Sequence, residues 1–193
     1  MRPVSWTLLV GLLLATGAVA QESSKAPPSR LPRDPTSTPR NPPAQGHING
    51  QIYLGEEAPD FELDGSRGKP VRLTSFRGEW VVLVFADRRE QLAKLSAIDG
   101  DMKEMGAVLL GVCKEKAYVL ERYGPRVKLP FVVLADWSGE IAALYGLYNY
   151  ERSEIQSGFL VLDRTGTVRS AFVGATLPPE EIARIARFAV TGL

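Results

Sequence analysis

Trp80-Val81-Val82-Leu83-Val84-Phe85 is an unbroken apolar run, rich in β-branched and aromatic residues. Such a run is typical of a strand that is buried on both faces of a sheet. Two similar runs, 107–113 and 131–134, follow at intervals that leave room for a helix between consecutive strands. Buried strands separated by helices predict parallel pairing with right-handed crossovers. We therefore expect residues 80–85 to be the central strand of a sheet.

Several segments with the helical spacing of apolar residues accompany these strands. In 88–105, residues such as Leu92, Leu95 and Met102 recur among charges, which predicts one amphipathic helix that is weakened at Gly100. The C-terminal segment begins with prolines and acids, as helix starts do, and continues with an apolar stripe. The remaining expected helices are 114–123, 139–145 and this C-terminal segment, 178–189.

Two hairpins complete the expected fold. Residues 61–63 and 71–73 flank a Gly-rich turn, and 159–163 and 168–173 flank Thr165-Gly166. Parallel buried strands need helices on both faces, and a terminal hairpin extends the sheet. The order of elements predicts an α/β protein with a thioredoxin-like three-layer α/β/α sandwich and an N-terminal β-hairpin.

The first 46 residues differ in composition from the rest. Residues 1–20 have Arg2 before an apolar run and end in Ala18-Val19-Ala20, which predicts a cleaved signal peptide and a mature chain that begins at Gln21. Residues 21–46 are rich in Pro, Ser, Thr and Arg, and predict a disordered tether. The folded domain is then 47–193, exported to the periplasm or the extracellular space. A membrane contact would require an uncleaved signal segment.

Charge excludes one class of partner. From residue 46 onward the chain has 18 Lys and Arg against 20 Asp and Glu, without a basic stripe. Nucleic-acid binding is therefore not expected. The only histidine, His47, lies at the end of the tether. The sequence shows no metal-ligand cluster, phosphate loop or dinucleotide fingerprint, so we expect neither a metal nor a cofactor.

Cys113 is the only cysteine of the chain. One cysteine excludes an internal disulfide and Cys-x-x-Cys chemistry, but leaves single-cysteine mechanisms open. Cys113 ends the expected strand 107–113, where the carboxyl edge of a sheet opens to ligands. Lys114 and Lys116 would favour its thiolate. The alternative is a small hydrophobic side chain in the core.

Ordered motifs resemble those of one family. Residues 55–63, Gly-Glu-Glu-Ala-Pro-Asp-Phe-Glu-Leu, look like the opening G-x-x-A-P-D-F-x-L of the peroxiredoxins, the alkyl hydroperoxide reductase/thiol-specific antioxidant family. Residues 71–78, 80–85, 129–136 and 159–166 resemble further family segments in the family's order. The resemblance covers about residues 50–190. It implies a thioredoxin fold and antioxidant oxidoreductase chemistry through a cysteine thiolate.

The chain departs from the family at the site of that chemistry. The resemblance implies a P-x-x-x-[TS]-x-x-C loop after the central strand, but Phe85 is followed by Ala86-Asp87-Arg88-Arg89-Glu90. The resemblance also implies an arginine before strand 159–163, where this chain has Gln156. We take Asp87, Arg88, Arg89 and Gln156 as candidate binding residues of a remnant active site. Asp87 and Glu90 would otherwise cap the helix and pair with neighbours.

Two further groups of residues are candidates for a surface site. Tyr145, Tyr148 and Tyr150 would form a recognition surface or pack at the rim of the core. Arg122, Arg126 and Lys128 form a basic patch, interpreted as a charged surface loop.

Two functions remain open from these residues. The first is a binding or scaffold module, a pseudoenzyme that contacts an unidentified protein or small molecule. The second is an antioxidant oxidoreductase that works through Cys113, with an external thiol donor as the resolving partner.

Overall fold

The computed structural model describes residues 52–192 apart from 128 and 175. The predicted signal peptide, 1–20, and tether, 21–46, lie outside the described residues, as do His47 and Lys128. The described residues belong to one compact unit.

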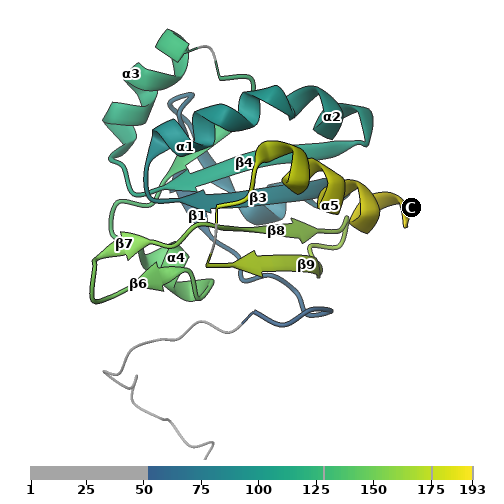
Figure 1. Ribbon diagram of the computed structural model, residues 1–193. Coiled ribbons are helices and arrows are strands. Elements are labelled where there is room, and N and C mark those ends of the chain that lie inside the picture. Colours follow the sequence, from purple (N-terminus) through teal and green to yellow (C-terminus); the bar gives the residue numbers. More distant parts are fainter. Residues whose placement is uncertain (1–51, 128, 175, 193) are drawn as a thin grey trace, which may run out of the picture. The chain divides into compact units, whose positions relative to one another are not determined.

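A five-stranded sheet forms the middle layer, in the order β5-β4-β3-β8-β9 (Figure 1). The three strands β3, β4 and β5 are parallel, β8 pairs antiparallel with β3, and β9 pairs antiparallel with β8. The predicted central strand is confirmed, because β3 lies between β4 and β8. The bounds are β3 (Trp80–Ala86), β4 (Ala107–Cys113), β5 (Val132–Ala135), β8 (Gly158–Leu162) and β9 (Val168–Val173).

The alternation of side chains along β3 divides the core between the two faces of the sheet. Val82 and Val84 pack on one face with Leu92 and Leu95, whereas Leu83 and the other alternate residues pack on the opposite face. Val82 and Leu83 are fully buried, as expected for a strand covered on both sides. The three-layer α/β/α fold is therefore confirmed.

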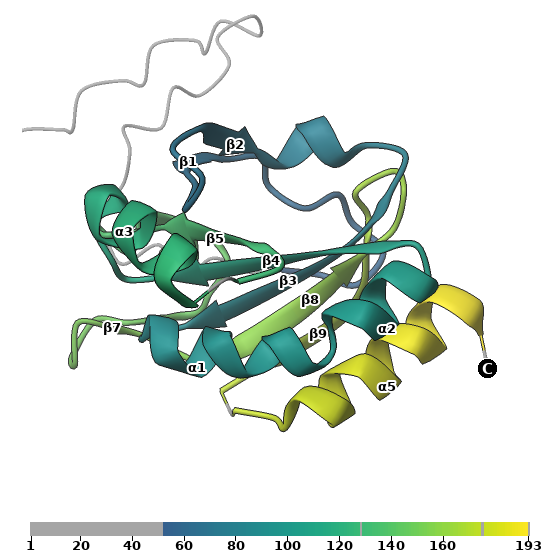
Figure 2. The same ribbon diagram turned by 90° about the horizontal axis from the view of Figure 1, so that it is seen from above.

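Figure 2 shows α1, α2 and α5 along one face of the sheet, and the hairpin β1–β2 lies on the other side. The α4 helix contributes Ala142 to the core of that second face. No helix within the described residues has the length and apolar composition needed to cross a membrane. The α-helices are α1 (Arg89–Ala93), α2 (Asp99–Glu104), α3 (Ala117–Val127), α4 (Glu140–Leu144) and α5 (Pro179–Thr191).

The prediction of one continuous helix over 88–105 is wrong. Between α1 and α2 the chain forms the 3₁₀ helix η2 (Lys94–Ala97), and Ile98, with φ −107° and ψ 0°, separates η2 from α2. Leu92 in α1, Leu95 in η2 and Ile98 after η2 are nevertheless all buried in the same part of the core.

The predicted helix over 114–123 is also displaced. It begins at Ala117 and continues to Val127, through Pro125. Proline lacks the N–H that would donate to the carbonyl four residues earlier, and α3 ends two residues after Pro125. Residues 114–116 instead form the turn after β4, in which the Glu115 N–H donates to the Cys113 carbonyl at 2.9 Å.

Both predicted hairpins are present. β1 (Glu62–Asp64) pairs antiparallel with β2 (Pro70–Arg72), and the 3₁₀ helix η1 (Leu73–Phe76) follows β2. A third hairpin, β6 (Tyr148–Asn149) with β7 (Glu154–Ile155), was not predicted, because two-residue strands leave no periodic pattern.

Asp163 organises the turn between β8 and β9. Its carboxylate is 7% exposed and accepts hydrogen bonds from the Thr165 hydroxyl at 2.6 Å, the Thr167 N–H at 3.0 Å and Arg169 Nε at 2.7 Å. Burial raises the pKa of Asp163, but these hydrogen bonds outweigh burial and lower the pKa to about 2. Gly166, with φ +79°, supplies the left-handed residue that this turn requires.

Candidate functional site

The candidate site lies where β3 and β4 end. Ala86 and Cys113 are paired across these parallel strands, so both strands open at the same edge of the sheet. In open α/β sheets, ligands bind outside this carboxyl edge. The loop at Asp87 and Arg88 leads from β3 directly into α1.

Asp87 holds this loop in place. Its Oδ1 accepts a hydrogen bond from the Ile155 N–H at 3.1 Å, which joins the loop to β7. The expectation that Asp87 caps the helix is therefore wrong. The side chain of Gln91 caps the start of α1 instead, because its Oε1 accepts a hydrogen bond from the Arg88 N–H at 3.1 Å.

Asp87, Arg88 and Gln156, three of the candidate binding residues, come together around a polar hollow of about 700 Å³. Its lining mixes acids, bases and amides, so the hollow carries no strong charge of one sign. The other lining residues are Glu90, Gln91, Lys94, Asn149, Arg152, Glu154, Ile155, Ser157, Gly174 and Thr176.

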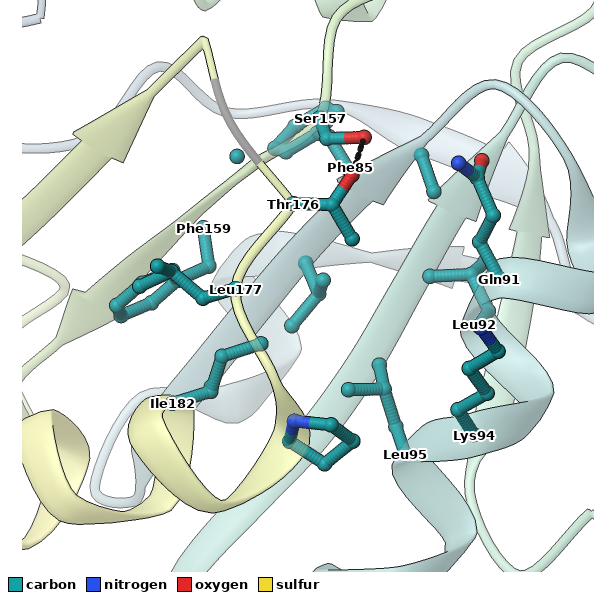
Figure 3. A pocket seen from close by; sticks show the side chains of 14 residues that line it. Phe85, Gln91, Leu92, Lys94, Leu95, Ser157, Phe159, Thr176, Leu177 and Ile182 are labelled. Atoms are coloured by element: carbon teal, nitrogen blue, oxygen red, sulfur yellow. Dashed lines mark hydrogen bonds between the residues drawn. The ribbon is translucent and has the colours of Figure 1, made fainter.

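An apolar cavity of about 100 Å³ adjoins this hollow. Figure 3 shows Leu92 and Leu95 on one side of it, and Leu177 and Ile182 on the other. Both spaces share the four polar residues Gln91, Lys94, Ser157 and Thr176. The Thr176 and Ser157 hydroxyls are hydrogen-bonded at 2.9 Å, as the dashed line in Figure 3 marks. We call the apolar cavity and the polar hollow together the amphipathic cleft.

Arg89, the fourth candidate, is directed elsewhere. Its Nη1 lies 2.7 Å from the Glu115 carboxylate, and its guanidinium carbon lies 4.9 Å from the centre of the Tyr123 ring. Both partners belong to the segment after β4, and Arg89 lines neither part of the amphipathic cleft. The structure therefore separates Arg89 from Asp87, Arg88 and Gln156.

Cys113 is fully buried and lines no part of the cleft. Burial raises the pKa of its thiol from 9.0 to about 12, with Glu115 adding to the rise and Arg89 opposing it. The neutral thiol is therefore the stable form at pH 7.

The expectation that Lys114 and Lys116 favour the Cys113 thiolate is wrong. Lys114 donates to the Tyr148 hydroxyl at 3.0 Å and to the Ser153 carbonyl. The ammonium of Lys116 lies 4.7 Å from the centre of a Trp137 ring. Both lysines are engaged by aromatic residues of later segments, so neither lowers the pKa of Cys113.

The three tyrosines do not form one surface. Tyr145 is 1% exposed and donates its hydroxyl to the Pro59 carbonyl at 2.6 Å, and burial raises its pKa. It is a core residue. Tyr148 and Tyr150 lie nearer the surface, in edge-to-face contact with ring centres 5.1 Å apart.

Sequence reasoning missed the residues that form the far side of the cleft, Ser157, Thr176 and Leu177. A signal for them existed, since the predicted hairpin places the residues before β8 beside those after β9. Within residues 52–192, leaving aside 128 and 175, no three His, Cys, Asp or Glu side chains lie close enough to share a metal ion.

Curated relatives agree with the motif pattern. The chain is 28% identical to peroxiredoxin 2 of Thermoplasma acidophilum over 131 residues, which cover 60% of this chain and 64% of the relative. It is 24% identical to peroxiredoxin Bcp of Bacillus subtilis over 108 residues, which cover 53% of this chain and 69% of the relative. The chain thus spans about 64% of the length of the Thermoplasma relative.

Solved structures show the same fold. Peroxidoxin BcpB of Mycobacterium tuberculosis superposes with a TM-score of 0.65 at 18% identity, covering 74% of this chain and 99% of that one. AhpC of Enterococcus faecalis superposes with a TM-score of 0.64 at 16% identity, covering 74% and 98%. The model of the AhpC/TSA family matches residues 54–171, more than half of the sequence. The chain therefore belongs to the AhpC/TSA family.

Proposed function

We propose that this protein is an exported binding module of the AhpC/TSA family that does not reduce peroxides and binds a small amphipathic ligand in the cleft. One observation carries the proposal: the cleft lies at the β3–α1 junction, and neither of its parts is lined by a cysteine. The resemblance implies that the family places its reactive thiolate at this junction. Here a cleft lies at this junction, and no thiol lines it.

The lining of the cleft indicates the chemistry of the ligand. A cavity of about 100 Å³ has room for a short alkyl group, surrounded by Leu92, Leu177 and Ile182. The adjoining hollow offers both an acid, Asp87, and bases such as Arg152. A compound with a short alkyl side chain and neutral, hydrogen-bonding amides satisfies both parts.

We expect N-acetylnorleucine amide to bind in the cleft more tightly than N-acetylglycine amide, because only the former places a butyl group in the apolar cavity. Leu177→Glu introduces a charge at this cavity and is expected to weaken binding of N-acetylnorleucine amide about tenfold or more. NMR titration of the backbone amides of residues 84–95 and 157–159 measures the affinity.

Leu54→Glu is the matched control, because Leu54 is 67% exposed and lies outside both parts of the cleft. It should leave the affinity unchanged. Equal binding of the two amides, or equal loss in both variants, contradicts a ligand site in the cleft.

Export is supported by the sequence of residues 1–20 alone. If the full chain is produced in a bacterial host, we expect mass spectrometry to find a mature protein that begins at Gln21. Ala18→Arg together with Ala20→Arg removes the small-x-small pattern and should block the cleavage. An intact N-terminus in the wild-type protein would contradict export by a cleaved signal peptide.

The alternative function, an antioxidant oxidoreductase, needs Cys113 to attack a peroxide oxygen. The thiol would become a sulfenic acid with release of water or an alcohol, and an external thiol would then form a mixed disulfide and release water. The burial of Cys113 and its raised pKa oppose the first step.

A further inference from the structure

One face of α3 gathers arginines and tyrosines that the proposed function does not use. Tyr118, Arg122 and Arg126 are spaced four residues apart and form one row along the helix, and Val119 and Tyr123 form the next row. Together with Arg89 of α1 they line a hollow of about 220 Å³. Three guanidinium groups and two phenol rings thus surround one space.

Only one of the three arginines that line this hollow forms ion pairs with described residues. Arg89 is paired with Glu115 at 2.7 Å and Glu90 at 3.0 Å. No ion pair to a described residue is made by Arg122 or Arg126. The remaining positive charge therefore comes from Arg122 and Arg126.

The acid nearest in sequence does not neutralise these two arginines. Glu121 lies beside Arg122 along the chain, but it does not line the hollow, and its carboxylate lies towards the turn at Gly68. Like charges four residues apart repel each other on a helix. Arg122 and Arg126 thus face the hollow without a counter-charge from their own helix.

We propose that this hollow, the α3 arginine site, binds a small phosphate monoester with an aromatic group. A planar guanidinium group can donate two parallel hydrogen bonds to a phosphate group. The double negative charge of a phosphate monoester would also relieve the repulsion between Arg122 and Arg126. The exposed ring of Tyr118 offers an apolar face for the organic part of the ligand. The site lies on α1 and α3 and shares no lining residue with the amphipathic cleft.

A structural role is the competing explanation, because basic residues near the C-terminal end of a helix stabilise it by interacting with the helix dipole. The structural role and the binding role predict different effects when the arginines are substituted. Loss of a dipole interaction lowers the unfolding midpoint without an effect on ligands, whereas loss of a binding site lowers affinity in a protein that remains folded.

Phenyl phosphate, titrated into the full mature chain at low ionic strength and followed by isothermal calorimetry, tests the proposal. We expect saturable binding that weakens as NaCl is added. The double variant Arg122→Gln with Arg126→Gln should lose at least about tenfold in affinity. Arg164→Gln is the control, because it removes the same charge from an exposed residue of the β8–β9 turn, and it should bind as the wild type does.

Two further ligands test the chemistry of the site. Phenol should not bind, and inorganic phosphate should bind more weakly than phenyl phosphate. Tyr118→Ala should remove this difference without changing the affinity for inorganic phosphate. The proposal is overturned if wild-type protein does not bind phenyl phosphate, if Arg164→Gln loses as much affinity as the double variant, or if inorganic phosphate binds equally well.

Discussion

Hydrogen peroxide is expected to oxidise Cys113 at pH 7 about a thousandfold more slowly than it oxidises an exposed cysteine. The thiolate is the nucleophile, and each unit by which the pKa of a thiol rises lowers the thiolate fraction at pH 7 about tenfold. Burial raises the pKa of Cys113 from 9.0 to about 12. Full burial also keeps the peroxide from the sulfur, which slows the reaction as well.

The rate of thiol loss at increasing peroxide concentration measures this reactivity. The matched reference is a protein with Cys113→Ser and Ser138→Cys, because Ser138 is exposed and the variant keeps one thiol per chain. The pH profiles should also differ. The rate for Cys113 should keep rising about tenfold per pH unit beyond pH 9, as long as the protein remains folded, whereas the reference should level off near pH 9.

Rapid oxidation of Cys113, with a sulfenic acid or a mixed disulfide as the product, would overturn the proposal of a binding module. Peroxide consumption that needs an external thiol and disappears in Cys113→Ser would establish the alternative, an oxidoreductase with a relocated nucleophile. A slow reaction in the folded protein that becomes fast in denaturant would show that the fold itself suppresses the thiol.

Phe85→Ala is expected to lower the free energy of unfolding by about 3–5 kcal/mol. Phe85 is fully buried at the end of β3, with its ring centre 5.4 Å from that of Tyr145. The substitution removes a large apolar side chain and leaves a cavity that the rigid sheet cannot close. Urea unfolding, followed by tryptophan fluorescence, measures the loss.

Phe188→Ala is the control for the same chemical change at a surface position. Phe188 is 65% exposed on α5, and we expect its removal to change stability by no more than about 0.5 kcal/mol. If Phe85→Ala does not fold, Phe85→Leu should fold with a loss of about 1.5 kcal/mol. Equal effects at Phe85 and Phe188 would contradict the packing described for β3.

The sheet could be predicted because each of its main strands shows a pattern of apolar residues over a few neighbouring positions. The run from Trp80 to Phe85 is apolar on both faces, and only a covered central strand satisfies such a run. The break in the 88–105 helix was not predictable in the same way. Its periodicity fits an α-helix, whereas in the folded chain Leu92, Leu95 and Ile98 are buried together in the core with a 3₁₀ helix between Leu92 and Ile98.

The candidate site was likewise predictable only in part. The resemblance aligns Asp87, Arg88 and Gln156 with family positions, and in the structure all three line one hollow. The positions of Arg89 and of the lysines after Cys113 depend on partners that are distant in sequence. Arg89 bonds to Glu115, and Lys114 to Tyr148, which local patterns do not reveal.

The layered α/β fold, the family and the single cysteine can all be recognised in the amino-acid sequence. These follow from hydrophobic periodicity, ordered motifs and residue identity, all of which are local properties of the chain. The folded chain was needed to show that Cys113 is buried with a raised pKa, that Arg89 lies outside the cleft, and that Leu177 lines it. Burial and charge pairing depend on which distant segments pack together, and for that reason the chemistry of this site became visible only in the folded chain.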